Sequence, residues 1–289
     1  MGAMALRVFD AVEGVPLFGT LVLLDPKGTI ALQQRDIMLT ATVLMLTVVI
    51  PVLILTAVIA WRYRASNTKA RYLPNWDHNK MEEFVWWGVP TIIIGILAVI
   101  TWQSSHVLDP FRPLASPKNT LVIRVIALDW KWLFLYPEQN IATVNFIQIP
   151  EDRPIRFEIT ADAPMNSFWI PQLAGQIYAM AGMVTQLHIE ANEPGDYAGA
   201  SANFSGAGFA GMKFTVRASS EKEFDQWVQS VQTGSAVLDR DTYGSLMEPS
   251  VEEPARFYAG TEPGLFEYVL DKFTKPPRGE GKTENMYHN

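Results

Sequence analysis

The 289-residue sequence contains no cysteine and four histidines, His78, His106, His188 and His288. The absence of cysteine excludes disulfides and removes the thiolate ligands on which many zinc and copper sites depend. No histidine lies near other histidines or carboxylates at the spacing of a metal site. The sequence also lacks a nucleophile–base arrangement, which argues against an enzyme that acts alone. We therefore predict no metal site and no independent catalytic centre in this chain.

Two kinds of side chain remain as candidate ligands. His188 lies between two apolar residues in an alternating segment, and this pattern predicts an exposed residue on a strand. Met180, Met183 and Met212 are thioethers of the kind that bind copper(I). Packing in a hydrophobic core is the preferred interpretation of these methionines.

Charged residues make up only 18% of the chain, and residues 37–60 and 84–102 contain none. A bilayer core about 30 Å thick is crossed by about 20 helical residues, so each segment is long enough to span a membrane. A buried core helix of such length usually keeps a polar face, and these segments lack one. Pro51 and Pro90 are tolerated in transmembrane helices and predict kinks. We predict a transmembrane hairpin that follows an N-terminal segment, residues 1–36.

The connection between the two spans, residues 61–83, is rich in basic side chains. They are Arg62, Arg64, Lys69, Arg71 and Lys80. The positive-inside rule places this loop in the cytoplasm, with both termini and the large C-terminal part on the far side. Residues 103–289 contain 15 Lys and Arg against 23 Asp and Glu. This negative balance argues against binding to nucleic acid or to anionic lipid.

Short alternating runs begin near residue 121 and continue to residue 220. Ile155, Phe157 and Ile159 alternate with polar residues, and similar runs recur about every ten residues with Pro, Gly and Asn between them. This pattern is typical of an antiparallel β-sandwich or barrel. The predicted fold class is therefore a membrane-anchored all-β protein.

An aromatic-rich, partly helical extension is predicted over residues 221–275. Its first part places Phe224, Trp227 and Val231 on one face of a helix. Packing of the extension on the sandwich is the preferred interpretation, and a contact surface for a partner subunit is the alternative. Residues 276–289 are charged and contain Pro and Gly, so we predict that they are disordered.

Seven motifs occur in one order along the chain, and together they resemble subunit II of the bo-type haem–copper quinol oxidases. The motifs are LLDPKG (23–28), WRYRASN (61–67), PNWDHN (74–79), DWKWLFLYPEQNIATVN (129–145), MNSFWIPQL (165–173), QIYAMAGM (176–183) and GFAGMKF (208–214). The resemblance covers about residues 23–275 and implies a cupredoxin-like sandwich over residues 103–220. It also implies a bacterial inner membrane, with the sandwich in the periplasm.

The loop SANFSGAGFAGMKF, residues 201–214, is similar in position to the copper-binding loop of cytochrome c oxidase subunit II. The copper ligands of that family are a histidine, two cysteines, a second histidine and a methionine. Bridging thiolates hold the two copper ions, and no residue of this chain supplies them. The resemblance implies a loop that cannot build the copper centre. The aligned positions, in that order, are Asn166, Phe204, Gly208, Met212 and Thr215.

We expect this loop to be retained as a scaffold turn. Its glycines suit backbone angles that other residues avoid. Phe204 and Phe209 are expected to fill the space that the metal would occupy. Upstream, four aromatic residues alternate along one predicted strand: Trp130, Trp132, Phe134 and Tyr136. In the copper-bearing relatives this region lies between the copper and the large subunit, and packing is the preferred interpretation here.

The resemblance implies a non-catalytic subunit of a proton-pumping respiratory terminal oxidase. In that family the large subunit I holds the haems and copper, oxidises ubiquinol and reduces oxygen to water. The two predicted spans contain no histidine, so they offer no axial ligand to a haem. The resemblance implies no cofactor in this chain. The implied partners are subunit I, other small oxidase subunits, the lipid bilayer, and ubiquinol bound by the complex.

Glu82 and Glu83 immediately precede the second span. In the family, a glutamate three residues before a tryptophan and seven before a proline lies at the mouth of a proton channel of the large subunit. Glu83 has this spacing to Trp86 and Pro90, so the resemblance implies a role in proton entry, with Glu82 as the weaker candidate. Acidic residues also favour helix N-termini because of the helix dipole, which is the structural alternative.

Two other functions stay open. A menaquinol oxidase subunit would be indistinguishable in this chain. A freestanding, membrane-tethered β-sandwich that binds a ligand or a metallochaperone would need no haem subunit, so copurification separates it from an oxidase subunit.

Overall fold

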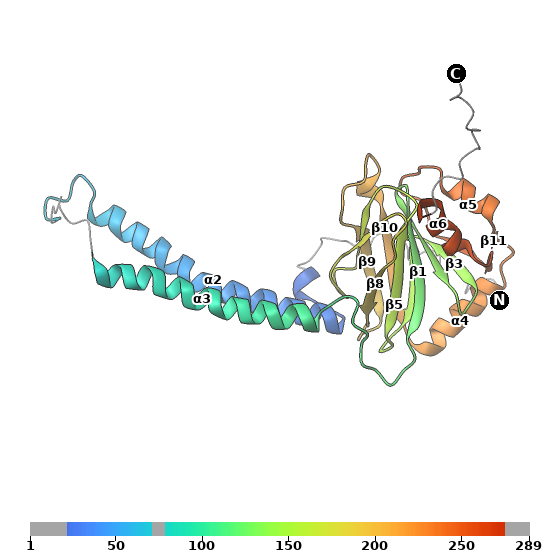
Figure 1. Ribbon diagram of the computed structural model, residues 1–289, viewed down its shortest axis with the longest axis horizontal. Helices are drawn as coiled ribbons and strands as arrows, with labels where there is room; N and C mark the ends of the chain where they lie inside the picture. Colours follow the sequence, from blue (N-terminus) through green and yellow to red (C-terminus); the bar gives the residue numbers. More distant parts are fainter. Residues whose placement is uncertain (1–21, 71–78, 275–289) are drawn as a thin grey trace, which may run out of the picture. The chain divides into compact units, whose positions relative to one another are not determined.

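The computed structural model describes residues 22–70 and 79–274 (Figure 1). The chain divides into two compact units. One unit comprises Gln33–Asp109, and the other combines the N-terminal residues up to Leu32 with the chain from Pro110 onward. His78, His288 and the predicted disordered tail lie outside the described residues.

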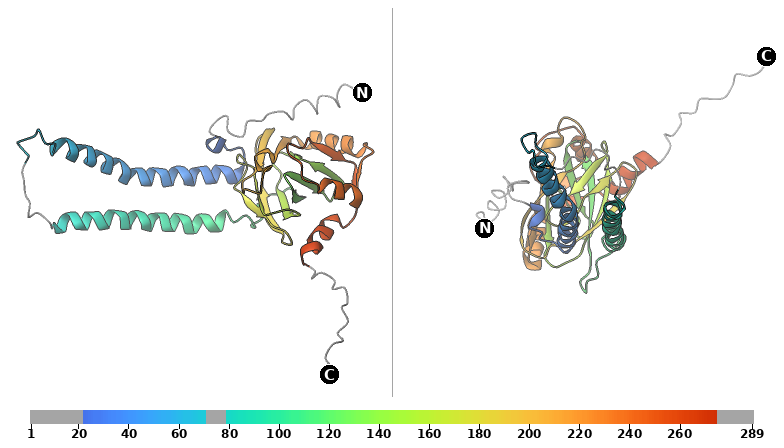
Figure 2. Two further views of the ribbon diagram at one scale, coloured as in Figure 1. Left: turned by 90° about the horizontal axis from the view of Figure 1, so that it is seen from above. Right: turned by 90° about the vertical axis from the view of Figure 1, so that its left-hand side faces the viewer.

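The first unit is a hairpin of α2 (Thr29–Arg62) and α3 (Lys80–Val107), which Figure 2 shows as two long, nearly antiparallel helices. Both are long and apolar enough to cross a membrane, and the most apolar stretch of each is 0% buried within the protein. Asn79 caps α3 by accepting a hydrogen bond from the Met81 N–H at 3.1 Å. The two predicted helices are confirmed, and each extends beyond its uncharged span because polar residues continue the helix at both ends.

The second unit is a β-sandwich of two packed sheets. The larger sheet has the strand order β12-β3-β2-β1-β5-β8, and the smaller has the order β4-β10-β9-β6-β7. The first ten strands are β1 (Leu121–Leu128), β2 (Lys131–Tyr136), β3 (Ile141–Val144), β4 (Phe146–Pro150), β5 (Ile155–Ala161), β6 (Asn166–Trp169), β7 (Ile177–Ala179), β8 (Thr185–Ile189), β9 (Gly195–Ser201) and β10 (Lys213–Ser219). The predicted sandwich is confirmed. It is not purely antiparallel, because β1 pairs with β5 and β4 with β10 in parallel, a direction that alternation alone does not specify.

Aromatic rings fill the space between the two sheets. Phe168 from β6 stacks on Phe214 from β10 with 5.0 Å between ring centroids. Trp132 and Phe134 from β2 contact these rings edge-on or tilted, with 5.2–6.2 Å between ring centroids. Gly199 in β9 provides the room, since a Cβ there would lie 2.2 Å from the Phe214 ring. The preferred packing interpretation holds for Trp132 and Phe134.

The C-terminal extension packs on the larger sheet and against β4 of the smaller sheet. Its elements are α4 (Glu221–Gln232), β11 (Val237–Leu238), α5 (Arg240–Leu246), β12 (Arg256–Tyr258), β13 (Gly260–Thr261) and α6 (Leu265–Thr274). The predicted helix is α4, which begins at a capping box formed by Ser220 and Glu223. Strand β12 joins the sheet antiparallel to β3, and apolar residues of α5 and α6 pack on the outer face of β1 and β2. The extension therefore packs on the sandwich as preferred.

Candidate functional site

The loop between β9 and β10 is the candidate site, and backbone hydrogen bonds close it at both ends. The Ser201 N–H donates to Met212 O at 3.1 Å, and the Ala202 N–H donates to Ser167 O at 2.9 Å. Between these ties, Phe209–Gly211 forms the single 3-10 turn η2. The loop is thus a closed turn fastened to β6 and β10.

Trp130 packs across the inner side of this loop. Its indole Nε1–H donates to Ser205 O at 3.1 Å. A Cβ at Gly208 would lie 2.3 Å from the Trp130 ring, so only glycine fits there. Gly206 has a φ of +116°, which L side chains rarely adopt, whereas Gly208 has an ordinary φ of −91°. The expected backbone role of glycine therefore holds at Gly206, while Gly208 is required by the indole.

The positions that align with copper ligands hold structural contacts instead. Asn166 is buried; its Oδ1 accepts from Ser201 Oγ at 2.8 Å and its Nδ2 donates to Pro164 O at 2.8 Å. Met212 is fully buried in the core, and Thr215 lies within β10 with its N–H donating to the Asn145 carbonyl. These side chains do not fit a dinuclear copper centre, because they include no thiolate and no imidazole.

The expectation that Phe204 fills the copper space is wrong. Phe204 is 76% exposed, and its ring contacts Phe209 at 5.7 Å on the outside of the loop. The indole of Trp130 already occupies the inner side, so the ring of Phe204 is directed outward. Among the methionines considered as ligands, Met212 is a core residue as preferred, but Met183 is exposed.

The prediction for His188 is also wrong. The side chain is 5% exposed, and its Nδ1 lies 3.0 Å from the carbonyl oxygen of Pro110. The chain that follows α3 runs against this part of β8, so alternation along the strand does not leave the side chain in solvent. His106 lies in the last turn of α3, with Nδ1 2.7 Å from Trp102 O. Within the described residues, no three histidine, aspartate or glutamate side chains come together in a way that could hold a metal ion.

Glu82 and Glu83 lie in the first turn of α3, just after its cap at Asn79. Both side chains are exposed, and the Glu83 N–H donates to Asn79 O at 3.0 Å. Glu83 borders an open hollow along α3 together with Lys80 and Trp87. This geometry suits both the helix-dipole interpretation and a carboxylate at a membrane entrance.

The comparisons with known proteins agree with this geometry. Residues 138–219 match the family described as "Cytochrome C oxidase subunit II, periplasmic domain", and residues 232–277 match "COX Aromatic Rich Motif". The chain is 51% identical over 253 residues to cytochrome bo(3) ubiquinol oxidase subunit 2 of Pseudomonas aeruginosa, an alignment that covers 88% of this chain and 76% of the relative. It is 53% identical over 252 residues to ubiquinol oxidase subunit 2 of Acetobacter aceti, covering 86% of this chain and 82% of the relative. The chain belongs to the ubiquinol oxidase subunit 2 family.

A solved structure, the periplasmic domain of subunit II of cytochrome oxidase from Bradyrhizobium japonicum, is 23% identical and covers 40% of this chain and 96% of that one, with a TM-score of 0.38. This similarity is too low to add to the family assignment.

In this ubiquinol oxidase subunit 2 family member, two lysines hold the aromatic-rich motif on the sandwich. Lys131 of β2 is buried, and its Nζ donates to the carbonyls of Leu246 and Glu248 at 2.9 and 2.7 Å. Burial lowers the pKa of Lys131. Lys272 of α6 pairs with Asp162 at 2.5 Å. No pattern in the sequence points to a role for either lysine.

Proposed function

We propose that this chain is the non-catalytic subunit II of a proton-pumping terminal oxidase that oxidises ubiquinol and reduces oxygen to water. The observation that carries the proposal is the family membership, at more than half identity to subunits named for ubiquinol oxidation. The chain lies in a bacterial inner membrane, with two spans and its sandwich in the periplasm. The basic connection after α2, with Arg62 and Arg64, supports this orientation.

Electrons enter the complex elsewhere, because this chain cannot accept them through a copper centre of the cytochrome c oxidase type. It contains no cysteine, and the Asn166 amide is engaged by Ser201 and Pro164. Haems and copper belong to the large subunit I. A menaquinol oxidase subunit is the second candidate, and the ubiquinol reading is favoured because both relatives above are named for ubiquinol.

The partners follow from the surfaces that the chain leaves uncovered. The apolar stretches of α2 and α3 are exposed along their length, which supports burial against lipid and against helices of subunit I. On the sandwich, Phe204 and Met165 are both exposed, and Asn203 links their segments by donating to Met165 O at 3.0 Å. Such adjacent apolar side chains suit contact with subunit I or another small subunit.

Oxygen uptake by the purified complex tests this proposal. An affinity tag on this chain is used for purification in detergent, haem spectra are recorded, and ubiquinol, menaquinol and reduced cytochrome c are offered separately. Haem copurification with ubiquinol-driven uptake that does not need cytochrome c is the expected result. A haem-free chain without uptake would instead identify a freestanding tethered module, and uptake with menaquinol alone would identify the second candidate.

We further assign proton entry to Glu83, on the basis of its place at the start of α3. Glu83→Gln removes a titrating carboxylate while keeping the shape, so turnover and proton pumping should fall severalfold. Glu82→Gln is the matched control, one residue away in the same helical turn, and should leave both near the wild-type value. Equal, unimpaired rates in the two variants would mean that Glu83 only stabilises the start of the helix and has no role in proton entry.

A further inference from the structure

One edge of the sandwich receives the chain on both sides of the membrane hairpin. Strand β8 is the last strand of the larger sheet, and residues 190–193 follow it. The segment of residues 25–31, called here the strap, includes the first residues of α2 and lies against residues 172–173 and 190–193. Pro110, which follows α3, lies against His188 of β8. These contacts all lie within the sandwich unit.

The strap is held by backbone hydrogen bonds to two segments of the sandwich. The N–H groups of Lys27 and Gly28 donate to Gln172 O at 2.8 and 3.1 Å, and the Ala31 N–H donates to Leu173 O at 3.2 Å. In the reverse direction, the Asn192 N–H donates to Lys27 O at 2.8 Å. An isolated bridge pairs Gly28 with residue 191. The strap therefore covers backbone groups next to an edge strand that would otherwise stay open.

Gly28 sits where the strap and the sandwich come closest. A Cβ at this position would lie 2.6 Å from Glu190 O and 2.8 Å from Leu173 O. Both obstacles are backbone atoms, which cannot turn aside as a flexible side chain can. Glycine is therefore the one residue that fits the docked strap without displacement.

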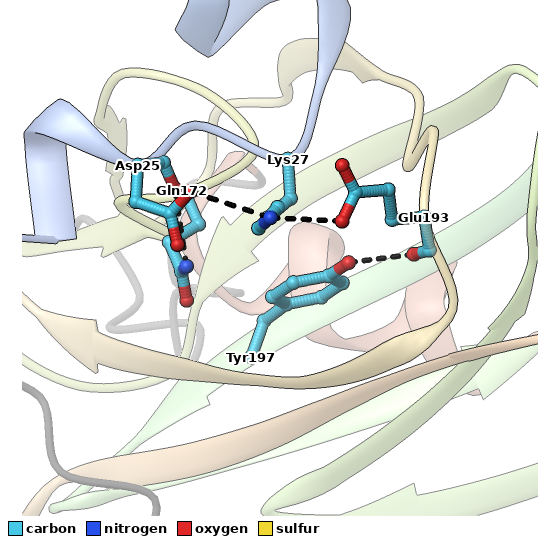
Figure 3. A network of polar contacts seen from close by, with 5 residues as sticks. All are labelled: Asp25, Lys27, Gln172, Glu193 and Tyr197. Carbon is cyan, nitrogen blue, oxygen red and sulfur yellow. Dashed lines mark hydrogen bonds and ion pairs between the residues drawn. The ribbon is translucent and has the colours of Figure 1, made fainter.

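Side chains fasten the strap on either side of Gly28, and Figure 3 shows the contacts around Lys27. Lys27 Nζ pairs with Glu193 at 2.8 Å and with Asp25 at 3.3 Å, and the bond to Glu193 is the main cause that raises the pKa of Lys27. Tyr197 holds the same turn by donating its OH to Glu193 O at 2.6 Å. Beyond the glycine, Thr29 Oγ1 donates to Asn192 Oδ1 at 2.9 Å. The strap is thus bonded through main chain and side chains together.

The second point of attachment is formed by one histidine. The backbone N–H of His188 donates to Pro110 O at 3.3 Å, and its ring Nδ1 lies 3.0 Å from the same oxygen. Because a carbonyl only accepts, the ring carries its proton on Nδ1 in this contact. His188 and Asn192 are four residues apart, so the two attachments share one short stretch of chain.

We propose that β8, residues 190–193 and residues 172–173 form a two-point anchor, which holds the strap at the start of α2 and Pro110 after α3 against the sandwich. This inference goes beyond the proposed function, since it concerns this chain whether or not an oxidase assembles around it.

Hydrogen exchange on the full-length chain in detergent tests the anchor at Gly28. Gly28→Ala places a methyl group against two carbonyl oxygens, so exchange at residues 27–31 and 192 should rise at least tenfold. Gly244→Ala in α5 is the matched control, because no atom lies within 4 Å of its added methyl group. Strands β1 and β2 should stay protected in both variants. Unchanged exchange at residues 27–31 in Gly28→Ala, or equal increases in both variants, would overturn the proposal.

A cysteine pair tests whether the strap stays docked in the membrane-embedded protein. Thr29→Cys and Asn192→Cys replace side chains that touch, in a chain that has no cysteine of its own. Rapid and nearly complete cross-linking is expected, and Gly28→Ala should slow it at least tenfold. The single Thr29→Cys variant controls for links to other proteins. Slow cross-linking in the otherwise unchanged chain would mean that the strap is not held, and the anchor would be rejected independently of any haem or uptake result.

Discussion

The loop of residues 202–212 and the two-point anchor are both closed around a glycine, but they differ in what the glycine faces. At Gly208 the neighbour is the indole of Trp130, and at Gly28 it is the backbone of Leu173 and Glu190. The loop lies between two strands of one sheet, whereas the strap joins the sandwich from far away in the sequence. A substitution in the loop must therefore strain the folded domain, while a substitution in the strap can be relieved by undocking.

Gly208→Ala should give the largest effect on stability. Its methyl group would lie 2.3–2.6 Å from three atoms of the Trp130 ring, which is pinned by its bond to Ser205 O. Overpacking of this kind costs about 3 kcal/mol of the free energy of unfolding. Thermal unfolding of the full-length chain in detergent measures the loss. Trp130→Phe in the same background should restore part of it, and an unimpaired single variant would show that the loop yields as easily as the strap.

Asn166→Leu should give the second-largest loss of stability. The substitution removes the acceptor of Ser201 Oγ and the donor to Pro164 O inside the domain, at a cost of about 2 kcal/mol. A double-mutant cycle with Ser201→Ala isolates the bond between the two side chains. Additive losses would contradict the view that this pair replaces a ligand position with a structural bond.

The two regions also differ in how far the sequence could predict them. The prediction that this chain cannot build a thiolate-bridged copper centre followed from composition and motif order, because no arrangement of this chain supplies a cysteine. The two spans and the sandwich followed from uncharged length and alternation. These signals are local in the sequence and can be recognised without knowledge of tertiary contacts.

The predictions that were wrong concern residues whose exposure depends on tertiary contacts. His188 alternates as an exposed residue should, yet the chain at Pro110 covers it. Phe204 was expected inside because the family comparison left a space, and the distant Trp130 fills that side of the loop. The motif LLDPKG contributed to the family resemblance, but the sequence did not indicate its structural role. The partners of Lys27 are about 145 and 166 residues away in sequence.

Alkaline pH should release the strap before it disturbs the loop. Burial, followed by the nearby Glu193 charge, raises the pKa of Tyr197 to about 12 from its ordinary value of 10.0. Because the folded state holds this proton more tightly, its contribution is complete below pH 10 and is lost as the pH rises toward 12. The raised pKa of Lys27 acts in the same direction.

A spin label on Leu23→Cys, next to the strap, measures this release as increased mobility between pH 10 and 12. Tyr197→Phe removes one titrating group and should make the change shallower. A label that stays immobile up to pH 12 would show that backbone bonds alone hold the strap.

Lys27→Met should have the smallest effect. The Lys27–Glu193 pair is partly exposed, so solvent and salt screen it and its contribution to stability is small. Exchange at residues 27–31 should therefore rise only a few-fold at low salt, and the difference from the unchanged chain should shrink in 1 M salt. Gly28→Ala should be insensitive to salt, because its methyl group meets neutral carbonyls. If exchange at residues 27–31 rose more in Lys27→Met than in Gly28→Ala, charge pairing rather than close backbone contact would hold the strap. The strap would then differ from the loop around Gly208 because electrostatic attraction holds the strap and packing holds the loop.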